Sequence, residues 1–401
     1  AKNLTGITFA NNQAELSKGM WVVVETTSNG QTWTDNDGYQ HTRIASRPML
    51  VNMGDTAKTI TLKDSSTSLR KTIDDNNVPV KTNDVAIGGT VNYNVESAIP
   101  MYEYNAQTRL AANALLFQID DIFSAGLDYQ FTTGQPASAV TVGGVAVAAS
   151  KYTVAFDENA RKLSIKFNND WIIENQGQNV KVSYSAKLNS DAVANDTTGN
   201  TNTATLTFTQ NPNTPNDTAT LSDSTKTFTY KFKIHKIDRY NSTADMTGVE
   251  FTLYTDENCT DVLKINGVDA KLTVGTGNMS NVLAGLDEGT YYMKETVLKS
   301  ASYSDIGVVK VIVTAEKTAG NQPTGKATIA MQSAPTGSDI EEGSTVSTTN
   351  TYGLVLKVAN TKGLNIPEAG AFSAILIMLA GALLVVGGLY IMGKGNKGEQ
   401  K

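Results

Sequence analysis

Short runs of Val and Ile that alternate with polar residues recur along this chain, separated by stretches rich in Thr, Ser, Asn and Gly. A period of two is typical of strands that bury one face, and polar turns of this composition join strands rather than helices. The 401 residues exceed the usual size of a single domain. We therefore predict an all-β protein built from tandem β-sandwich domains.

Charge and residue types exclude several classes of function. Only 18% of the residues are charged, and the net charge of -6 is spread along the chain, which leaves no basic stripe for a nucleic acid. His41 and His235 have no serine elbow or zinc-type spacing around them, so we expect no enzyme activity on external substrates, no metal and no cofactor. Cys259 is the single cysteine; it excludes an intrachain disulfide and is expected to be a small buried residue.

The C-terminal end carries a membrane-length apolar segment. Residues 371–392 are apolar or small and uncharged, and about 20 such residues span the hydrocarbon core of a bilayer. Lys394, Lys397 and Lys401 follow in a short polar tail, as expected for a tail that stays cytoplasmic. We predict a transmembrane helix here.

A short motif stands directly before this apolar segment, and it consists of Ile366, Pro367, Glu368, Ala369 and Gly370. The order of pentapeptide, apolar span and basic tail resembles the sorting signal of Gram-positive wall proteins, whose usual motif is Leu-Pro-any-Thr-Gly. The resemblance implies that a sortase cleaves between Ala369 and Gly370, carries Ala369 as an acyl-enzyme and leaves the protein on the cell wall after transient membrane insertion. An ordinary single-pass anchor is the alternative.

Turn-rich segments divide the rest of the chain. Residues 1–64 hold two strand patterns, at 19–25 and 48–52, and resemble the closing strands of the N-terminal domain in sortase-assembled pilins. The Asn- and Pro-rich stretch 211–216 reads as a linker. We therefore expect a partial domain at 1–64, β-sandwiches at 65–215 and 216–363, and the sorting signal at 364–401.

Three apolar strand faces near the C-terminus each end in one polar residue. Alternate positions share a face of a strand. Lys236, Glu295 and Asn360 each lie on the same strand face as the apolar residues before them, so we expect their side chains to enter a core. A buried ammonium or carboxylate costs several kcal/mol unless it is paired or neutralised. We therefore expect the three side chains to meet.

Such a meeting has chemical consequences. Burial lowers the pKa of a lysine and raises that of a glutamic acid, so Lys236 can be a neutral nucleophile while Glu295 stays protonated and polarises the Asn360 amide. Attack at Asn360 would release ammonia and leave an amide crosslink between the first and last strands. In the alternative, the lysine extends to the rim and the glutamate pairs with a surface cation.

The same region carries a family resemblance. The segments 236–238, 246–254, 289–296 and 358–363 look like a collagen-adhesin B-type domain in their order and spacing. The resemblance implies an immunoglobulin-like or collagen-adhesin-like sandwich with an isopeptide bond.

The preceding unit resembles the isopeptide-forming domain of fimbrial shaft proteins through the segments 71–73, 87–93, 117–121, 126–127 and 202–208. The resemblance implies the trio Lys71, Asp121 and Asn202, and strand parity supports Asp121 rather than the adjacent Asp120. The acidic pair could instead bind a cation, although two adjacent carboxylates are a weak metal signal.

Shaft subunits of this kind also use a lysine that attacks the acyl-enzyme of the neighbouring subunit. Lys63 lies where the family's lysine motif falls, and Lys58 is the second candidate. An ordinary exposed lysine is the alternative.

The sequence leaves two candidate functions: a structural subunit polymerised into a pilus through Lys-Ala linkages, or a single peptidoglycan-anchored adhesin that binds a host or partner surface.

Overall fold

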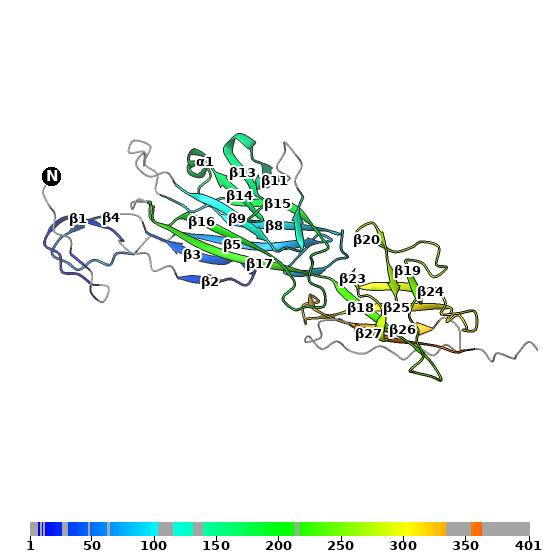
Figure 1. Cartoon of the computed structure of the whole chain (residues 1–401). Helices are drawn as coiled ribbons and strands as arrows, with labels where there is room; N and C mark the ends of the chain where they lie inside the picture. Colours follow the sequence, from blue (N-terminus) through cyan, green and yellow to red (C-terminus); the bar gives the residue numbers. More distant parts are fainter. Residues whose placement is uncertain are drawn as a thin grey trace, which may run out of the picture.

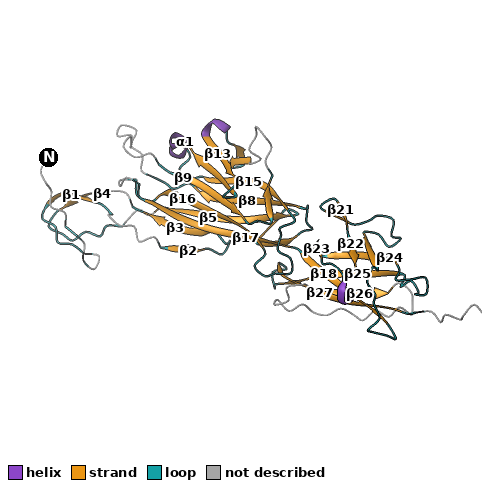
Figure 2. Cartoon of the chain, viewed as in Figure 1, coloured by secondary structure: helices purple, strands orange, loops and turns teal. Residues whose placement is uncertain are grey.

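The computed structural model describes residues 7–8, 10, 13–25, 31–46, 49–61, 65–102, 115–130, 139–212, 216–333 and 354–362. Figures 1 and 2 show that strands dominate these residues and that two sandwiches follow one another along the chain. The sorting pentapeptide, the apolar segment 371–392 and Lys63 lie outside the described residues. Within those residues, no helix is long and apolar enough to cross a bilayer.

The middle sandwich has two facing sheets around one core. The first sheet runs in the order β12 (Val145–Ala146), β11 (Ala139–Val142), β15 (Asn179–Leu188), β8 (Thr90–Ala98), β5 (Ser65–Asp75), β3 (Gln40–Ile44) and β2 (Thr32–Thr34), with β10 (Leu127–Tyr129) beside β15 and β6 (Val78–Val80) beside β5. The second runs in the order β13 (Tyr152–Asp157), β14 (Lys162–Phe167), β9 (Phe117–Phe123), β16 (Asn200–Thr209), β17 (Thr218–Phe228) and β7 (Thr82–Asp84). A short helix, α1 (Asn169–Glu174), and a 3-10 turn, η1 (Ala149–Lys151), complete this unit.

The C-terminal sandwich is smaller. One sheet has the order β23 (Leu283–Leu286), β18 (Tyr230–Asp238) and β27 (Leu354–Asn360). The other has the order β22 (Lys271–Thr273), β19 (Glu250–Tyr254), β24 (Gly289–Val297), β25 (Val308–Lys317) and β26 (Pro323–Ser333). A hairpin of β20 (Lys264–Ile265) and β21 (Val268–Asp269) and the 3-10 turn η2 (Thr276–Asn278) lie outside these sheets.

Strand pairing shifts two of the expected domain boundaries. At the N-terminal end, β1 (Gly19–Val23) and β4 (Met49–Met53) pair with each other and with no other described strand, whereas β3 pairs with β5 in the middle sandwich. At the other boundary, β17 pairs along its length with β16, and Leu221 belongs to the middle core. The C-terminal sandwich therefore begins near Tyr230 rather than at residue 216.

Cys259 does not lie in a core. It is half-buried in a turn after β19, with a left-handed φ of 55°, and its amide donates to the Asp256 carbonyl at 3.1 Å. The expectation of a buried cysteine was wrong, because the residue follows the apolar part of its strand and takes a turn position.

The two sandwiches join through backbone and side-chain contacts. The Gln322 side chain before β26 accepts hydrogen bonds from the Lys81 and Thr82 amides at 2.9 and 3.1 Å, and the Ile87 amide donates to the Gly285 carbonyl at 3.0 Å. Gly325 has a φ of 87°, and a Cβ there would lie 2.5 Å from a carbonyl oxygen of the middle sandwich. Only glycine permits this close approach.

Carboxyl groups from both sandwiches meet at the same junction. Asp84, at the end of β7, lies beside Asp287 and Glu288, which follow β23. Glu288 pairs with Lys317 at 2.7 Å. Burial, reinforced by the charge of Asp84, raises the pKa of Asp287 to about 7. The junction therefore holds a carboxyl group that retains its proton in the folded protein at a pH where it is ionised in the unfolded chain.

This proton makes the junction sensitive to pH. In the folded protein the pKa of Asp287 is raised from 3.8 to about 7. The protonated carboxyl group therefore contributes fully to the free energy of unfolding below the unfolded pKa, and this contribution is lost as the pH rises through 7. We expect Asp287→Asn to raise the Tm at about pH 8 and to change it much less at about pH 4. Asp191→Asn, at an exposed position, is the matched control; equal effects of the two variants at both pH values would contradict the prediction.

Candidate functional site

Lys236, Glu295 and Asn360 meet inside the C-terminal sandwich. Lys236 lies on β18 and Asn360 on the adjacent parallel strand β27, in a register that pairs Asp238 with Asn360. Glu295 comes from β24 in the facing sheet. The three residues are 0%, 4% and 1% exposed, because each continues the buried alternation of its strand. The structure thus brings together the three polar residues expected from strand parity.

Their contacts form a chain from amine to amide to acid. The Lys236 Nζ donates to the Asn360 Oδ1, and the Asn360 Nδ2 donates to Glu295 Oε1 and Oε2 at 3.1 and 2.9 Å. Nζ and the Glu295 Oε1 are 3.7 Å apart. The Phe251 ring centroid lies 5.5 Å from Nζ. Amine and amide are therefore adjacent, with the carboxyl group on the side of the amide nitrogen.

Burial shifts both ionisable groups of this trio. It lowers the pKa of Lys236 to about 8, although the nearby Glu295 charge acts in the opposite direction. Burial likewise raises the pKa of Glu295, against the influence of Lys236. Both shifts favour the neutral amine and the neutral acid, the forms needed for attack on an amide.

The second trio lies between the two sheets of the middle sandwich. Lys71 extends from β5 in one sheet, while Asp121 on β9 and Asn202 on β16 lie in the facing sheet. All three are at most 1% exposed. The Lys71 Nζ donates to the Asp121 Oδ2 at 2.6 Å. Burial lowers the pKa of Lys71, although the charge of Asp121 opposes the shift.

A fourth residue, Tyr184 on β15, belongs to this group and was missed by sequence reasoning. Its hydroxyl accepts from the Lys71 Nζ and donates to the Asp121 Oδ2. The rings of Tyr184 and Tyr93 lie with centroids 4.9 and 4.7 Å from Nζ. The alternation of apolar and polar residues in 180–188 places Tyr184 on the buried face of its strand. No sequence pattern, however, indicated which residues of other strands lie beside it.

The acid next in sequence points away from this site. Asp120 is half-buried, and its carboxylate accepts from the Ser164 hydroxyl at 2.6 Å and from the Gln118 amide at 2.9 Å. No group of three or more acidic, histidine or cysteine residues able to hold a metal occurs in the described part of the chain. Asp120 and Asp121 thus lie on opposite sides of β9 and have different hydrogen-bond partners.

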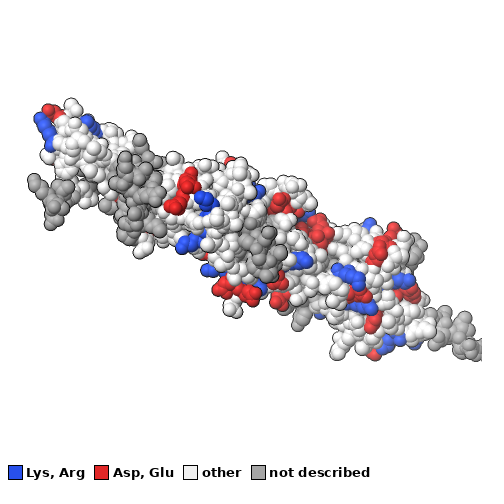
Figure 3. All heavy atoms as spheres, turned by 90° about the horizontal axis from the view of Figure 1, so that it is seen from above, with Lys and Arg blue, Asp and Glu red and all other residues white. Residues whose placement is uncertain are grey.

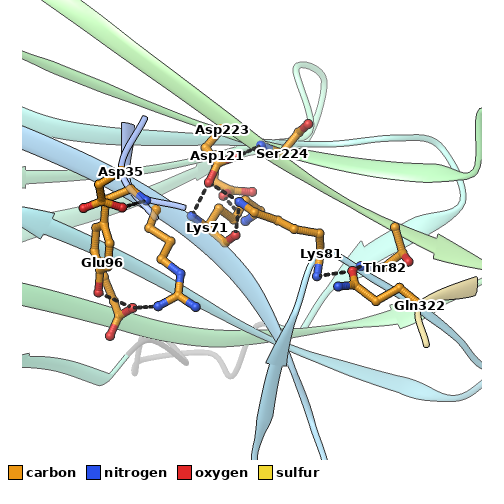
Figure 4. A network of polar contacts seen from close by, with 11 residues as sticks. Asp35, Lys71, Lys81, Thr82, Glu96, Asp121, Asp223, Ser224 and Gln322 are labelled. Carbon is orange, nitrogen blue, oxygen red and sulfur yellow. Dashed lines mark hydrogen bonds and ion pairs between the residues drawn. The ribbon is translucent and has the colours of Figure 1, made fainter. Parts of the chain in front are cut away.

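A second polar layer fixes the backbone around Lys71 (Figure 4). Asp223 on β17 accepts from the Lys71 amide at 2.6 Å and from the Lys81 Nζ. The same Nζ donates to the Lys71 carbonyl at 2.7 Å. Lys71 is therefore held at its backbone as well as at its amine.

The remaining candidates lie elsewhere. His41 contacts Asp35 at 2.8 Å and stacks on Trp33, and His235 is half-buried on the outward side of β18. Lys58 is exposed and donates to the Asn52 carbonyl. Acidic and basic side chains are interspersed on the face shown in Figure 3, without an extended basic surface.

Comparison with known proteins gives matches to pilins. Residues 87–212 match the family model of Gram-positive pilin backbone subunit 2, Cna-B-like domain. The T6 backbone pilin of serotype M6 Streptococcus pyogenes is 19% identical in sequence. The superposition covers 81% of each chain and has a TM-score of 0.50. No curated protein sequence matches.

Two further solved structures of major pilins are similar to this chain. The full-length major pilin SpaD from Corynebacterium diphtheriae is 19% identical, with 81% of this chain and 76% of that chain covered and a TM-score of 0.47. BcpA, the major pilin subunit of Bacillus cereus, is 15% identical, with 81% and 85% covered and a TM-score of 0.46. The expected resemblance to Gram-positive pilins is confirmed: residues 87–212 match the family model of a Gram-positive pilin backbone subunit, and the chain has the fold of a backbone pilin.

Proposed function

We propose that this protein is a structural shaft subunit of a covalent, sortase-assembled pilus, and that an autocatalytic Lys-Asn amide bond closes each of its two sandwiches. The observation that carries the proposal is that each sandwich fully buries a lysine, an acid and an asparagine, and that the lysine contacts the acid in the middle sandwich and the asparagine in the C-terminal one. Buried charged pairs rarely improve stability over apolar residues of the same size, which favours a chemical role for both groups.

In the C-terminal sandwich, the neutral Lys236 amine attacks Cγ of Asn360 and forms a new C–N bond. Glu295 contacts the amide nitrogen, so its carboxyl group can protonate that nitrogen as the old C–N bond breaks. The proton lost by the amine restores the acid, and ammonia leaves. The products are one amide bond and one ammonia molecule, without an external reactant.

In the middle sandwich, the corresponding bond joins Lys71 to Asn202 with Asp121 as the acid. It would connect β5 to β16 and thus tie one sheet to the other. The C-terminal bond would instead connect neighbouring strands of one sheet. Both bonds supply a covalent restraint in a chain with only one cysteine.

Assembly would use the sorting signal. A sortase would cleave between Ala369 and Gly370 and join the Ala369 carbonyl to the Lys63 amine of the next identical subunit; the last subunit would be joined to peptidoglycan. The sequence order of pentapeptide, apolar span and basic tail supports this step. The protein would then lie at the cell surface, anchored in the wall.

The choice of acid in the middle sandwich can be tested by intact mass. We expect the denatured parent to be lighter than its sequence mass by two ammonia molecules, and Asp121→Ala or Asp121→Asn to be lighter by only one, because the acid of one trio is lost. Asp120→Ala is the matched control and should match the parent. Loss of two ammonia molecules from the Asp121 variants would show that Asp121 is not needed.

The mechanical role of the C-terminal bond can be tested by proteolysis and unfolding. Asn360→Ala should digest faster and lose roughly 2–5 kcal/mol of unfolding free energy, by analogy with the loss of a disulfide. Asn195→Ala removes a buried asparagine outside both trios and serves as the control. If the two variants digest equally fast, the bond is not what protects the sandwich.

Polymerisation can be tested with the cognate sortase. The parent should give a ladder of multimers that resist SDS, and Lys63→Ala should remain monomeric because it lacks the nucleophile. Lys58→Ala is the matched control and should form the ladder. A ladder from Lys63→Ala but not from Lys58→Ala would reassign the nucleophile, and the absence of any ladder would favour the single-adhesin alternative.

A further inference from the structure

The Tyr184 hydroxyl occupies the centre of the middle trio. It contacts the Lys71 Nζ on one side and the Asp121 Oδ2 on the other. The Asn202 side chain is also near enough to influence its ionisation. One hydroxyl therefore neighbours the amine, the acid and the amide of the proposed reaction.

The two trios differ in how the acid reaches the amide. In the C-terminal sandwich, both Glu295 carboxyl oxygens contact the Asn360 Nδ2 directly. In the middle sandwich, Asp121 is one methylene shorter, and its Oδ1 has no hydrogen-bond partner among the described residues. The Asn202 Oδ1 and Nδ2 likewise lack partners there. The middle trio thus needs another group to carry a proton to the amide nitrogen.

We propose that Tyr184 is a catalytic proton relay for formation of the Lys71–Asn202 bond; this inference rests on the proposed function. The Lys71 amine attacks Cγ of Asn202, and one amine proton passes to the Asp121 Oδ2. The Tyr184 hydroxyl gives its proton to the Asn202 nitrogen, which leaves as ammonia, and Asp121 returns a proton to the tyrosine oxygen. One C–N bond forms and one breaks, and the protons balance.

The surroundings of Tyr184 suit a relay. Burial, reinforced by the charge of Asp121, raises the pKa of Tyr184 well above its usual value, so the hydroxyl keeps its proton until the amide nitrogen becomes basic. The ring is packed against Tyr93 and Phe123, with centroids 5.6 and 5.9 Å away. This packing fixes the hydroxyl between the reacting groups.

Tyr184→Phe tests the relay because it keeps the ring and removes only the hydroxyl. In cell-free synthesis followed by intact mass and peptide mapping, we expect the middle bond to form at least about a hundredfold more slowly, the lower end of what a positioned proton-transfer group contributes. The Lys236–Asn360 bond of the same molecule should form at the parental rate, because Tyr184 belongs to the other sandwich. The ring beside Lys236 is that of Phe251, which has no hydroxyl to lose. That second bond is an internal control for folding.

Tyr102→Phe is the matched control variant. Tyr102 is buried in the same sandwich and donates to the Thr209 carbonyl at 2.7 Å, at the other end of β16 from Asn202. Its loss should leave both bonds at the parental rate. A parental rate in Tyr184→Phe, or equal slowing in Tyr102→Phe, would overturn the relay.

A rescue experiment separates a relay from a structural role. Asp121→Glu lengthens the acid to match Glu295, so the double variant Asp121→Glu/Tyr184→Phe should recover the middle bond at least partly. A purely structural hydroxyl would not be replaced in this way, and absence of recovery in a correctly folded double variant counts against the relay. A parent that never forms the middle bond would overturn the proposed function itself, and the relay with it.

Discussion

The burial of a lysine amine between two sheets is the constraint on which both sandwiches depend. Lys71 and Lys236 are each completely buried, and a charged amine in such a place would be strongly unfavourable without partners. Each sandwich therefore places a carboxyl group beside the amine, and each must close its sheets tightly enough to exclude water. The surrounding apolar core lowers the pKa of both lysines. The packing that stabilises the fold is thus the same packing that favours the neutral form of the amine.

The two sandwiches place the buried amine, acid and amide on different strands. In the C-terminal unit, amine and amide come from adjacent parallel strands, and the acid reaches across from the other sheet. In the middle unit, the amine comes from one sheet, whereas acid and amide share the other. The shorter acid of the middle unit is accompanied by a tyrosine hydroxyl between the two sheets. Among the described residues, the shorter of the two acids is thus the one that a tyrosine hydroxyl contacts.

Strand parity predicted much of this arrangement, and its failures have physical reasons. The alternation that leads to Lys236, Glu295 and Asn360 depends only on local backbone geometry, so it could be followed in the sequence. Tyr184 could not be assigned because its partners come from two other strands. Residues 211–216 are predicted as a linker between domains, yet the strands before and after them, β16 and β17, pair with each other, and the Gln210 amide donates to the Asp217 carbonyl at 2.9 Å. Hairpin turns and linkers use the same residues, so composition cannot separate them.

The position of the proposed bonds also decides which segments would bear a pulling force. With both bonds formed, force would pass from Lys71 directly to Asn202 and from Lys236 directly to Asn360, bypassing residues 72–201 and 237–359. The segment between Asn202 and Lys236 stays in line and contains the β16–β17 hairpin, in which Asn202 faces Thr225. Antiparallel pairs pulled at one end open one hydrogen bond at a time, so this hairpin would be the weak element. Asp223 lies just inside the hairpin from that end, and it accepts hydrogen bonds from the Lys71 amide and the Lys81 amine (Figure 4). The hairpin is thereby held to the crosslinked strand β5, at the point where opening would begin.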